Sequence, residues 1–149
     1  MKAFLSIKYH SDHQNRDRIQ AISVALRENG IASTCIARDV ECWGEVKFDT
    51  CELMTRTFAA IDGCDLMVVD LTEKGVGVGI EAGYARAKNI PIVAIAQSGA
   101  DISETLRGIS RVVFGYADVD DLRCAIKEMI RNFPERFFND EAIVRKQSG

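Results

Sequence analysis

The sequence predicts an α/β protein, a three-layer sandwich in which helices cover both faces of a five-stranded parallel sheet. Two observations carry this prediction. Short apolar runs alternate along the chain with segments of helical periodicity, which is typical of a parallel sheet. The run at 66–69 is apolar at every position, as expected of a central strand that is buried on both faces.

Each element follows from a local pattern. Ile19, Ile22 and Leu26 recur on one face of the first helix. Gly30 then ends that helix. Pro91 stands first in its strand, where a missing N–H is tolerated. Right-handed crossovers give the flavodoxin-like strand order 2-1-3-4-5. The predicted strands are 3–7, 31–37, 66–69, 91–96 and 111–114, and the predicted helices are 16–29, 50–61, 80–88, 102–107 and 118–131.

Composition limits the classes of function. The chain has 149 residues, 47% hydrophobic and 28% charged, which indicates one globular domain over 1–133 and a short helix or tail at 134–149. A formal net charge of −3 gives no electrostatic support for binding a nucleic acid polymer. The apolar stretches are far shorter than the ~20 residues that span a bilayer, and we expect no signal peptide and no membrane partner.

The cysteines and histidines predict neither a metal site nor a cofactor. The five cysteines form no CxxC pair, and their odd number suits free thiols in the cytoplasm. His10 and His13 lie close together, but neither a cysteine nor a third histidine is near them in the sequence.

The candidate site lies where the strands end. In a sheet of this order, ligands bind at the carboxyl ends of the strands, near the switch point between the first and third strands. That rule brings together the segments 8–12, 70–79 and 97–103 with Trp43, the only tryptophan. We therefore expect these segments to surround one cleft.

The segment from Asp70 to Glu81 carries the most chemistry. Gly75, Gly77 and Gly79 alternate with other residues, which lets the backbone approach a ligand closely and tolerates positive φ. A helix is predicted to follow, with Glu81 in its first turn, where the helix dipole keeps a carboxylate ionised. Such a carboxylate can act as a nucleophile on a sugar carbon. Two alternatives stay open: a glutamate that only offsets the dipole, and a dinucleotide-binding loop over 77–82.

The segment 75–85 resembles the nucleoside 2-deoxyribosyltransferase family, whose motif runs from a strand through a glycine-rich loop to Glu-Leu-Gly-Tyr-Ala. Within that family it is most similar to the 2'-deoxynucleoside 5'-phosphate N-hydrolases. The stretches at 97–99 and 103–108 follow the same pattern, and Glu41-Cys42-Trp43-Gly44 resembles a Glu-Ala-Trp-Gly stretch of related pyrimidine nucleotide hydrolases. The resemblance covers residues 58–108 well and the rest loosely.

The resemblance implies a retaining reaction on a small-molecule nucleoside or nucleotide. Glu81 would attack the anomeric carbon of a 2'-deoxyribosyl group and expel the base, and water or a second base would then take the sugar. The family places an aspartate where Thr57 stands here, so this chain lacks that second acid. Asp70 could replace it as an acid or orienting group, or be an ordinary loop-starting aspartate.

The resemblance also suggests contacts to a phosphate. Gly75 stands where the phosphate hydrolases often carry serine, while Ser98 and Ser103 remain. In the family, the counterpart of Ser103 reaches the phosphate from the neighbouring subunit, which implies a homodimer or a higher homo-oligomer. Turn formation and helix capping are the alternative roles of both serines.

Four more residues are candidates for substrate binding. Lys8 could meet a phosphate and Tyr9 could stack on a base or sugar, or both could be solvated loop residues. Trp43 could stack on a base or cover the edge of the core. Arg107 could pair with a phosphate or cap its short helix.

We thus expect an enzyme that cleaves or transfers the N-glycosidic bond of 2'-deoxynucleosides or their 5'-monophosphates. Two alternatives stay open. Thr57 favours a nucleotide-binding or sensing module without turnover. The loop at 8–12 resembles the Ser-Tyr-Ser loop of TIR-type domains, which favours an NAD glycohydrolase.

Overall fold

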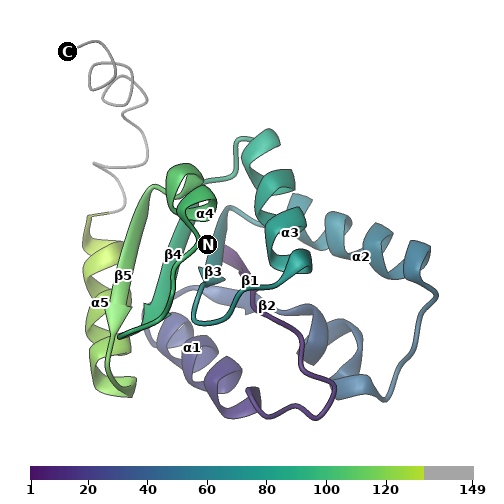
Figure 1. The fold of residues 1–149 in the computed structure, drawn as a ribbon, viewed down its shortest axis with the longest axis horizontal. Helices are drawn as coiled ribbons and strands as arrows, with labels where there is room; N and C mark the ends of the chain where they lie inside the picture. Colours follow the sequence, from purple (N-terminus) through teal and green to yellow (C-terminus); the bar gives the residue numbers. More distant parts are fainter. Residues whose placement is uncertain (133–149) are drawn as a thin grey trace.

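The computed structural model describes residues 1–132. Five parallel strands form one sheet in the order β2-β1-β3-β4-β5, which confirms the predicted fold class and strand order (Figure 1). The predicted helix or tail at 134–149 lies outside the described residues. The strands are β1 (Lys2–Ser6), β2 (Ala32–Thr34), β3 (Leu66–Asp70), β4 (Ile92–Gln97) and β5 (Val112–Tyr116).

Helices cover both faces of the sheet (Figure 1). One core lies under α1 (Arg16–Glu28) and α5 (Val119–Arg131), and the other lies under α2 (Thr50–Asp62), α3 (Val76–Ala87) and α4 (Glu104–Ile109). Side chains along a strand alternate between the two cores. In β1, Leu5 faces α1 and Phe4 faces α3, so Ser6 faces α3. In β3, Val68 faces α1, so Asp70 does as well.

The start of α3 differs from the prediction. The helix begins at Val76 rather than at residue 80, and Gly77 and Gly79 lie inside it. Gly75 is its extended N-cap, with φ −153°, and none of these three glycines has a positive φ. A glycine within a helix costs roughly 0.5–1 kcal/mol relative to alanine. Burial of Val78 and of the alanines that follow it against the sheet offsets that cost.

The predicted strand at 31–37 was also too long. After β2, the chain turns into a π-helical segment, η1 (Ile36–Val40), followed by a short 3-10 turn, η2 (Cys42–Gly44). The Cys35 N–H donates to the Asp39 carboxylate at 2.8 Å, and the Asp39 N–H donates to the Cys35 carbonyl at 2.8 Å. These two bonds stabilise a turn in place of further strand pairing.

Candidate active site at the carboxyl end of the sheet

One cavity of about 330 Å³ lies beside the end of β1. Its walls come from the loop after β1, from η1 and η2, from α2 and from α3. Five of the predicted site residues line it: Lys8, Tyr9, Trp43, Gly77 and Glu81. A second hollow of about 300 Å³ shares part of this wall and adds the loop before α3, so Gly75 and Gly77 border the same region.

Glu81 is the carboxylate that α3 presents to this cavity. The Ser6 hydroxyl, at the end of β1, donates a hydrogen bond to Glu81 Oε2. Burial raises the pKa of Glu81 from 4.5 to about 7, and the Ser6 hydrogen bond opposes part of that rise. Within residues 1–132, no cationic side chain forms an ion pair with this carboxylate. The surrounding protein therefore stabilises its negative charge poorly.

The expected reason for the ionisation of Glu81 was wrong. Because α3 begins at Val76, Glu81 lies in the second turn and not in the first. The effect of the helix dipole fades beyond the first turn. Desolvation governs the pKa instead, so Glu81 titrates near neutral pH.

The opposite wall is a turn in left-handed backbone. Cys42 has φ 47°, Trp43 has φ 58° and Gly44 has φ 86°. Residues other than glycine seldom adopt this conformation, which costs of order 1–3 kcal/mol each. A Cβ at position 44 would lie 3.4 Å from His13 Nε2, so the turn packs directly against that ring. Such strain is common where a structure fixes the position of a functional side chain.

Trp43 is held by its neighbours. The Arg16 guanidinium lies 4.5 Å from the centroid of the indole, and the His13 ring meets the indole edge-on at 5.9 Å. Glu41 precedes this turn and lines the same cavity. Desolvation raises the pKa of Glu41, and His13 opposes that shift. The cavity thus contains two carboxyl groups, Glu81 and Glu41, on different walls.

A charged cluster borders the cavity on the α1 side. Glu73 Oε1 accepts from Arg18 Nη2 at 2.8 Å, and Glu73 Oε2 lies 2.9 Å from His10 Nε2 and 3.4 Å from Lys8 Nζ. These partners, with Arg18 the strongest, lower the pKa of Glu73 to about 2. Lys8, the predicted phosphate contact, is therefore already paired with a carboxylate of the chain itself.

Asp70 belongs to this α1 side and not to the Glu81 cavity. It is 1% exposed, it accepts from the Thr72 N–H at 2.8 Å and from the Tyr116 hydroxyl at 3.2 Å, and Arg18 Nε lies 3.5 Å from it. Strand alternation places Asp70 and Ser6 on opposite faces of the sheet, and Ser6 is the partner of Glu81. The predicted role of Asp70 as the acid beside Glu81 has no support in this geometry.

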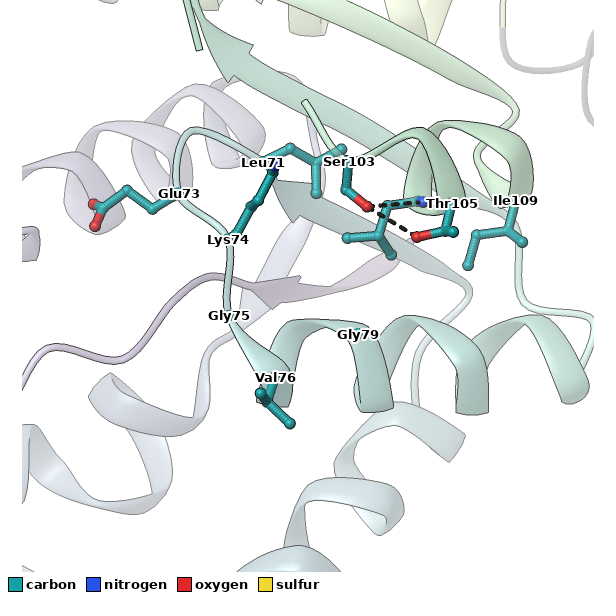
Figure 2. Close-up of a pocket in the computed structure, with 10 residues that line it drawn as sticks. Leu71, Glu73, Lys74, Gly75, Val76, Gly79, Ser103, Thr105 and Ile109 are labelled. Carbon is teal, nitrogen blue, oxygen red and sulfur yellow. Dashed lines mark hydrogen bonds between the residues drawn. The ribbon is translucent and has the colours of Figure 1, made fainter. Parts of the chain in front are cut away.

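Ser103 lines a different cavity, of about 560 Å³, between α3 and α4 (Figure 2). Its hydroxyl contacts the Thr105 hydroxyl at 2.9 Å and caps α4. Gly79 lines this cavity too, so Gly79 and Gly77 face different cavities. Ser98 and Arg107 are exposed and line neither cavity, and Arg107 pairs with Glu104 at 3.7 Å.

Thr57, at the position of the expected aspartate, is buried in α2 and donates to the Leu53 carbonyl at 2.8 Å. It supplies no acid to the cavity. The sequence prediction did not assign roles to Ser6, His13, Glu41 or Glu73. Only their positions at the ends of predicted strands and in polar loops could have indicated them, because their contacts join residues far apart in the chain.

No group of three metal-ligating side chains is present in residues 1–132. Over the same residues, no helix is long and apolar enough to cross a membrane. The fold and the site together define an α/β protein whose carboxylate-centred cavity lies at the carboxyl edge of a parallel sheet.

The comparisons with known proteins agree with the motif at 75–85. A protein of Syntrophotalea carbinolica named 2'-deoxynucleoside 5'-phosphate N-hydrolase 1 is 37% identical over 59 residues, which are 40% of this chain and 38% of that protein. A protein of the same name from Thermofilum pendens is 26% identical over 128 residues, 81% of this chain and 89% of that protein. No family model matches. The chain is therefore similar in sequence to two proteins that carry the name 2'-deoxynucleoside 5'-phosphate N-hydrolase 1.

Solved structures show the same fold. The CMP N-glycosidase BcmB of Clostridium botulinum superposes with a TM-score of 0.63 at 19% identity, covering 85% of this chain and 98% of that chain. The 2-deoxyribosyltransferase of Bacillus psychrosaccharolyticus superposes with a TM-score of 0.65 at 17% identity, covering 83% of this chain and 90% of that chain.

Proposed function

We propose that this protein breaks the N-glycosidic bond of a 2'-deoxynucleoside or of its 5'-monophosphate, with Glu81 as the nucleophile. The main supporting observation is a desolvated carboxylate that faces a cavity at the strand ends and has no cationic partner among residues 1–132. A developing positive charge on a sugar would stabilise that carboxylate far more than water does. The names of the two related proteins support the same class of substrate.

The first step forms a bond between a Glu81 carboxylate oxygen and the anomeric carbon C1'. The C1'–N bond breaks, and its electron pair leaves with the base. The transition state resembles an oxocarbenium ion, so the adjacent anion lowers its energy. Water, or a second base, then attacks C1' of the glycosyl-enzyme. The bond between C1' and the Glu81 oxygen breaks, its electron pair returns to the Glu81 carboxylate, and 2-deoxyribose, its 5-phosphate or a new nucleoside is released. Ser6 holds Glu81 in position throughout.

The departing base needs a proton, and Glu41 is the group that we assign to supply it. Glu41 lines the same cavity as Glu81, from the segment between η1 and η2, and its raised pKa keeps more of it protonated than an ordinary glutamate. In the hydrolytic step, the resulting carboxylate takes the proton back from the attacking water. This assignment replaces Asp70 and accounts for a site in which Thr57 cannot act as an acid.

The assembly that we propose is a homodimer through α3 and α4. Val76 is 83% exposed and Ile80 is 47% exposed on α3. A second copy covering this face would bury both side chains and could bring Ser103 to the site of its neighbour. Light scattering should give twice the mass of the chain, and Ile80→Lys should give the monomer.

Release of a free base tests the proposal. The purified protein is incubated with 2'-deoxynucleosides, their 5'-monophosphates and NAD, and the products are separated by chromatography. The wild type should release base from the deoxy substrates, and Glu81→Gln should lower the rate at least about 10³-fold, whereas the exposed control Glu104→Gln should not. Nicotinamide release would instead support an NAD glycohydrolase, and binding without turnover would support a sensing module.

The pH profile gives a second test. Because Glu81 must be ionised to attack and Glu41 must be protonated to serve the leaving base, kcat/KM should give a bell-shaped pH profile, one limb of which reports Glu81 at about 7. Ser6→Ala removes a hydrogen bond that favours the ionised form of Glu81, so that limb should move to higher pH. A profile whose limbs both stay in place in Ser6→Ala would contradict the role of Glu81.

A further inference from the structure

The proposed function leaves the choice between a nucleoside and its 5'-monophosphate open, and the charged cluster beside the cavity bears on that choice. We infer that the Glu73 carboxylate occupies the anion site that a substrate phosphate would need, so that the enzyme selects 2'-deoxynucleosides without a phosphate. This inference rests on the proposed function for its substrate, but its structural basis is separate from Glu81.

The contacts of Glu73 are those of a bound anion. One carboxylate oxygen accepts from Arg18 at 2.8 Å and lies 3.1 Å from the His10 ring nitrogen. The other lies 2.9 Å from the same nitrogen and 3.4 Å from Lys8 Nζ. Both oxygens of the carboxylate are thus satisfied by donors that a phosphate would otherwise use.

Two of these donors line the substrate cavity, and the third, Arg18, reaches Glu73 from α1. Lys8 and His10 line the cavity that contains Glu81, and within residues 1–132 Lys8 is the one lysine or arginine among its lining residues. The Lys8 side chain lies beside the start of α3, since a Cβ at Gly75 would lie 3.4 Å from Lys8 Cγ. Figure 2 shows the Glu73 side chain directed away from Ser103 and the rest of the α3–α4 cavity.

The charge count favours a substrate without a phosphate. Two cations, Lys8 and Arg18, face two anions, Glu73 and Asp70, so the charges of these four side chains cancel. A phosphate dianion would enter a site with no excess positive charge and would meet the Glu73 carboxylate at close range. Like charges at such distances in a partly desolvated site oppose binding strongly.

The experiment measures binding and turnover separately. Calorimetry at low salt titrates 2-deoxyribose 5-phosphate and 2-deoxyribose into the wild type, Glu73→Gln and Asp101→Asn. Asp101→Asn is the matched control. Asp101 pairs at 2.5 Å with Lys74, the residue that follows Glu73, and Asp101→Asn changes the net charge of the protein by the same amount as Glu73→Gln. Glu73→Gln should bind the phosphorylated sugar at least about tenfold more tightly than the wild type does, and Asp101→Asn should not.

Two further variants keep the result interpretable. Glu73→Ala removes the side chain, and a thermal melt checks that each variant is folded. In Glu73→Gln, Lys8 is left without its anion, so adding Lys8→Met should abolish the gain in phosphate binding. The ratio of kcat/KM for the 5'-monophosphate to that for the nucleoside should rise in Glu73→Gln by a similar factor.

Equal phosphate affinity in the wild type and in both folded Glu73 variants would overturn the inference, as would a wild type that prefers the 5'-monophosphate. If no variant releases base from either substrate, the proposed function fails, while the calorimetry still decides whether Glu73 excludes a phosphate.

Discussion

Glu73 and Glu81 stand eight residues apart on one loop and helix, and their surroundings differ completely. Cations surround Glu73, and its pKa falls to about 2. In the described part of the chain, the Ser6 hydroxyl is the one side chain that hydrogen-bonds Glu81, and burial raises the pKa of Glu81 to about 7. This comparison shows that residues of the protein itself, Lys8 and Arg18, already stabilise the charge of Glu73. The charge of Glu81 lacks a partner until a substrate develops positive charge beside it.

The largest expected effect concerns the acid that serves Glu81. Glu41→Gln should lower kcat about 10²–10³-fold, because the base must then leave without a proton. The loss should be much smaller with a 2-deoxyriboside whose leaving group is already acidic. Glu45→Gln, an exposed neighbour in the same segment, is the control for folding and charge. Equal losses with both kinds of leaving group would contradict the role of Glu41.

The second prediction separates stability from activity at Glu81. Its folded-state pKa lies above the ordinary 4.5, so the folded protein binds the proton more tightly. The proton on Glu81 therefore stabilises the folded state fully below pH 4.5, and this contribution is lost as the pH rises through about 7. Above pH 7 the buried, ionised carboxylate destabilises the fold. Glu81→Gln should remove that cost and raise the free energy of unfolding of the inactive protein by roughly 3 kcal/mol. Urea unfolding at pH 5 and pH 8 measures this change in the free energy of unfolding. An equal increase at both pH values would show that ionisation of Glu81 is not its cause.

The contribution of Glu73 to stability should depend on pH in the opposite direction from that of Glu81. Its folded-state pKa lies below 4.5, so its stabilisation is complete above that pH and is lost as the pH falls towards 2. One third of its side chain is exposed, and solvent screening reduces the effect. Glu73→Gln should cost about 1 kcal/mol at pH 7, and that cost should shrink steadily in titrations below pH 4.5. A cost independent of pH would point to lost packing instead.

The smallest effect concerns the glycines of α3. Gly77→Ala and Gly83→Ala should each stabilise the helix by about 0.5–1 kcal/mol, since a Cβ at either position meets no atom within 4 Å. Gly77 lines the cavity and Gly83 does not. Gly77→Ala should therefore raise KM while Gly83→Ala leaves it unchanged. If both variants change KM equally, the space beside Gly77 is not used by the substrate.

The hydrophobic periodicity of the sequence was sufficient to predict the five-stranded sheet and its strand order. The central strand and the helices on either side of it carry uninterrupted patterns, and the strand order follows from connections that are right-handed. The start of α3 could not be predicted locally, because alternating glycines are typical of a loop. Burial of Val78 against the sheet, a tertiary effect, decides it. The strand at 31–37 was shortened by a local bond of Asp39 that hydrophobicity does not reveal.

The candidate site was predicted only in part for a similar reason. Glu81 and Trp43 stood out by motif and composition, and both line the cavity. Ser6 acquires its role from a contact with a residue 75 positions away. Glu73 acquires its role from cations on α1 and on the loop after β1. The sequence offered Asp70 as a replacement for the acid missing at Thr57, but the alternation of β3 turns Asp70 to the other face of the sheet.

The left-handed turn at η2 has a practical consequence. Trp43 is the single tryptophan of the chain, and it stands in the cavity wall between a guanidinium and an imidazole. Its fluorescence is thus an intrinsic optical signal from the site, free of background from other indoles. Stopped-flow emission can follow ligand arrival in real time without a dye, and a red shift during gentle heating would reveal loosening of this wall before the sheet melts.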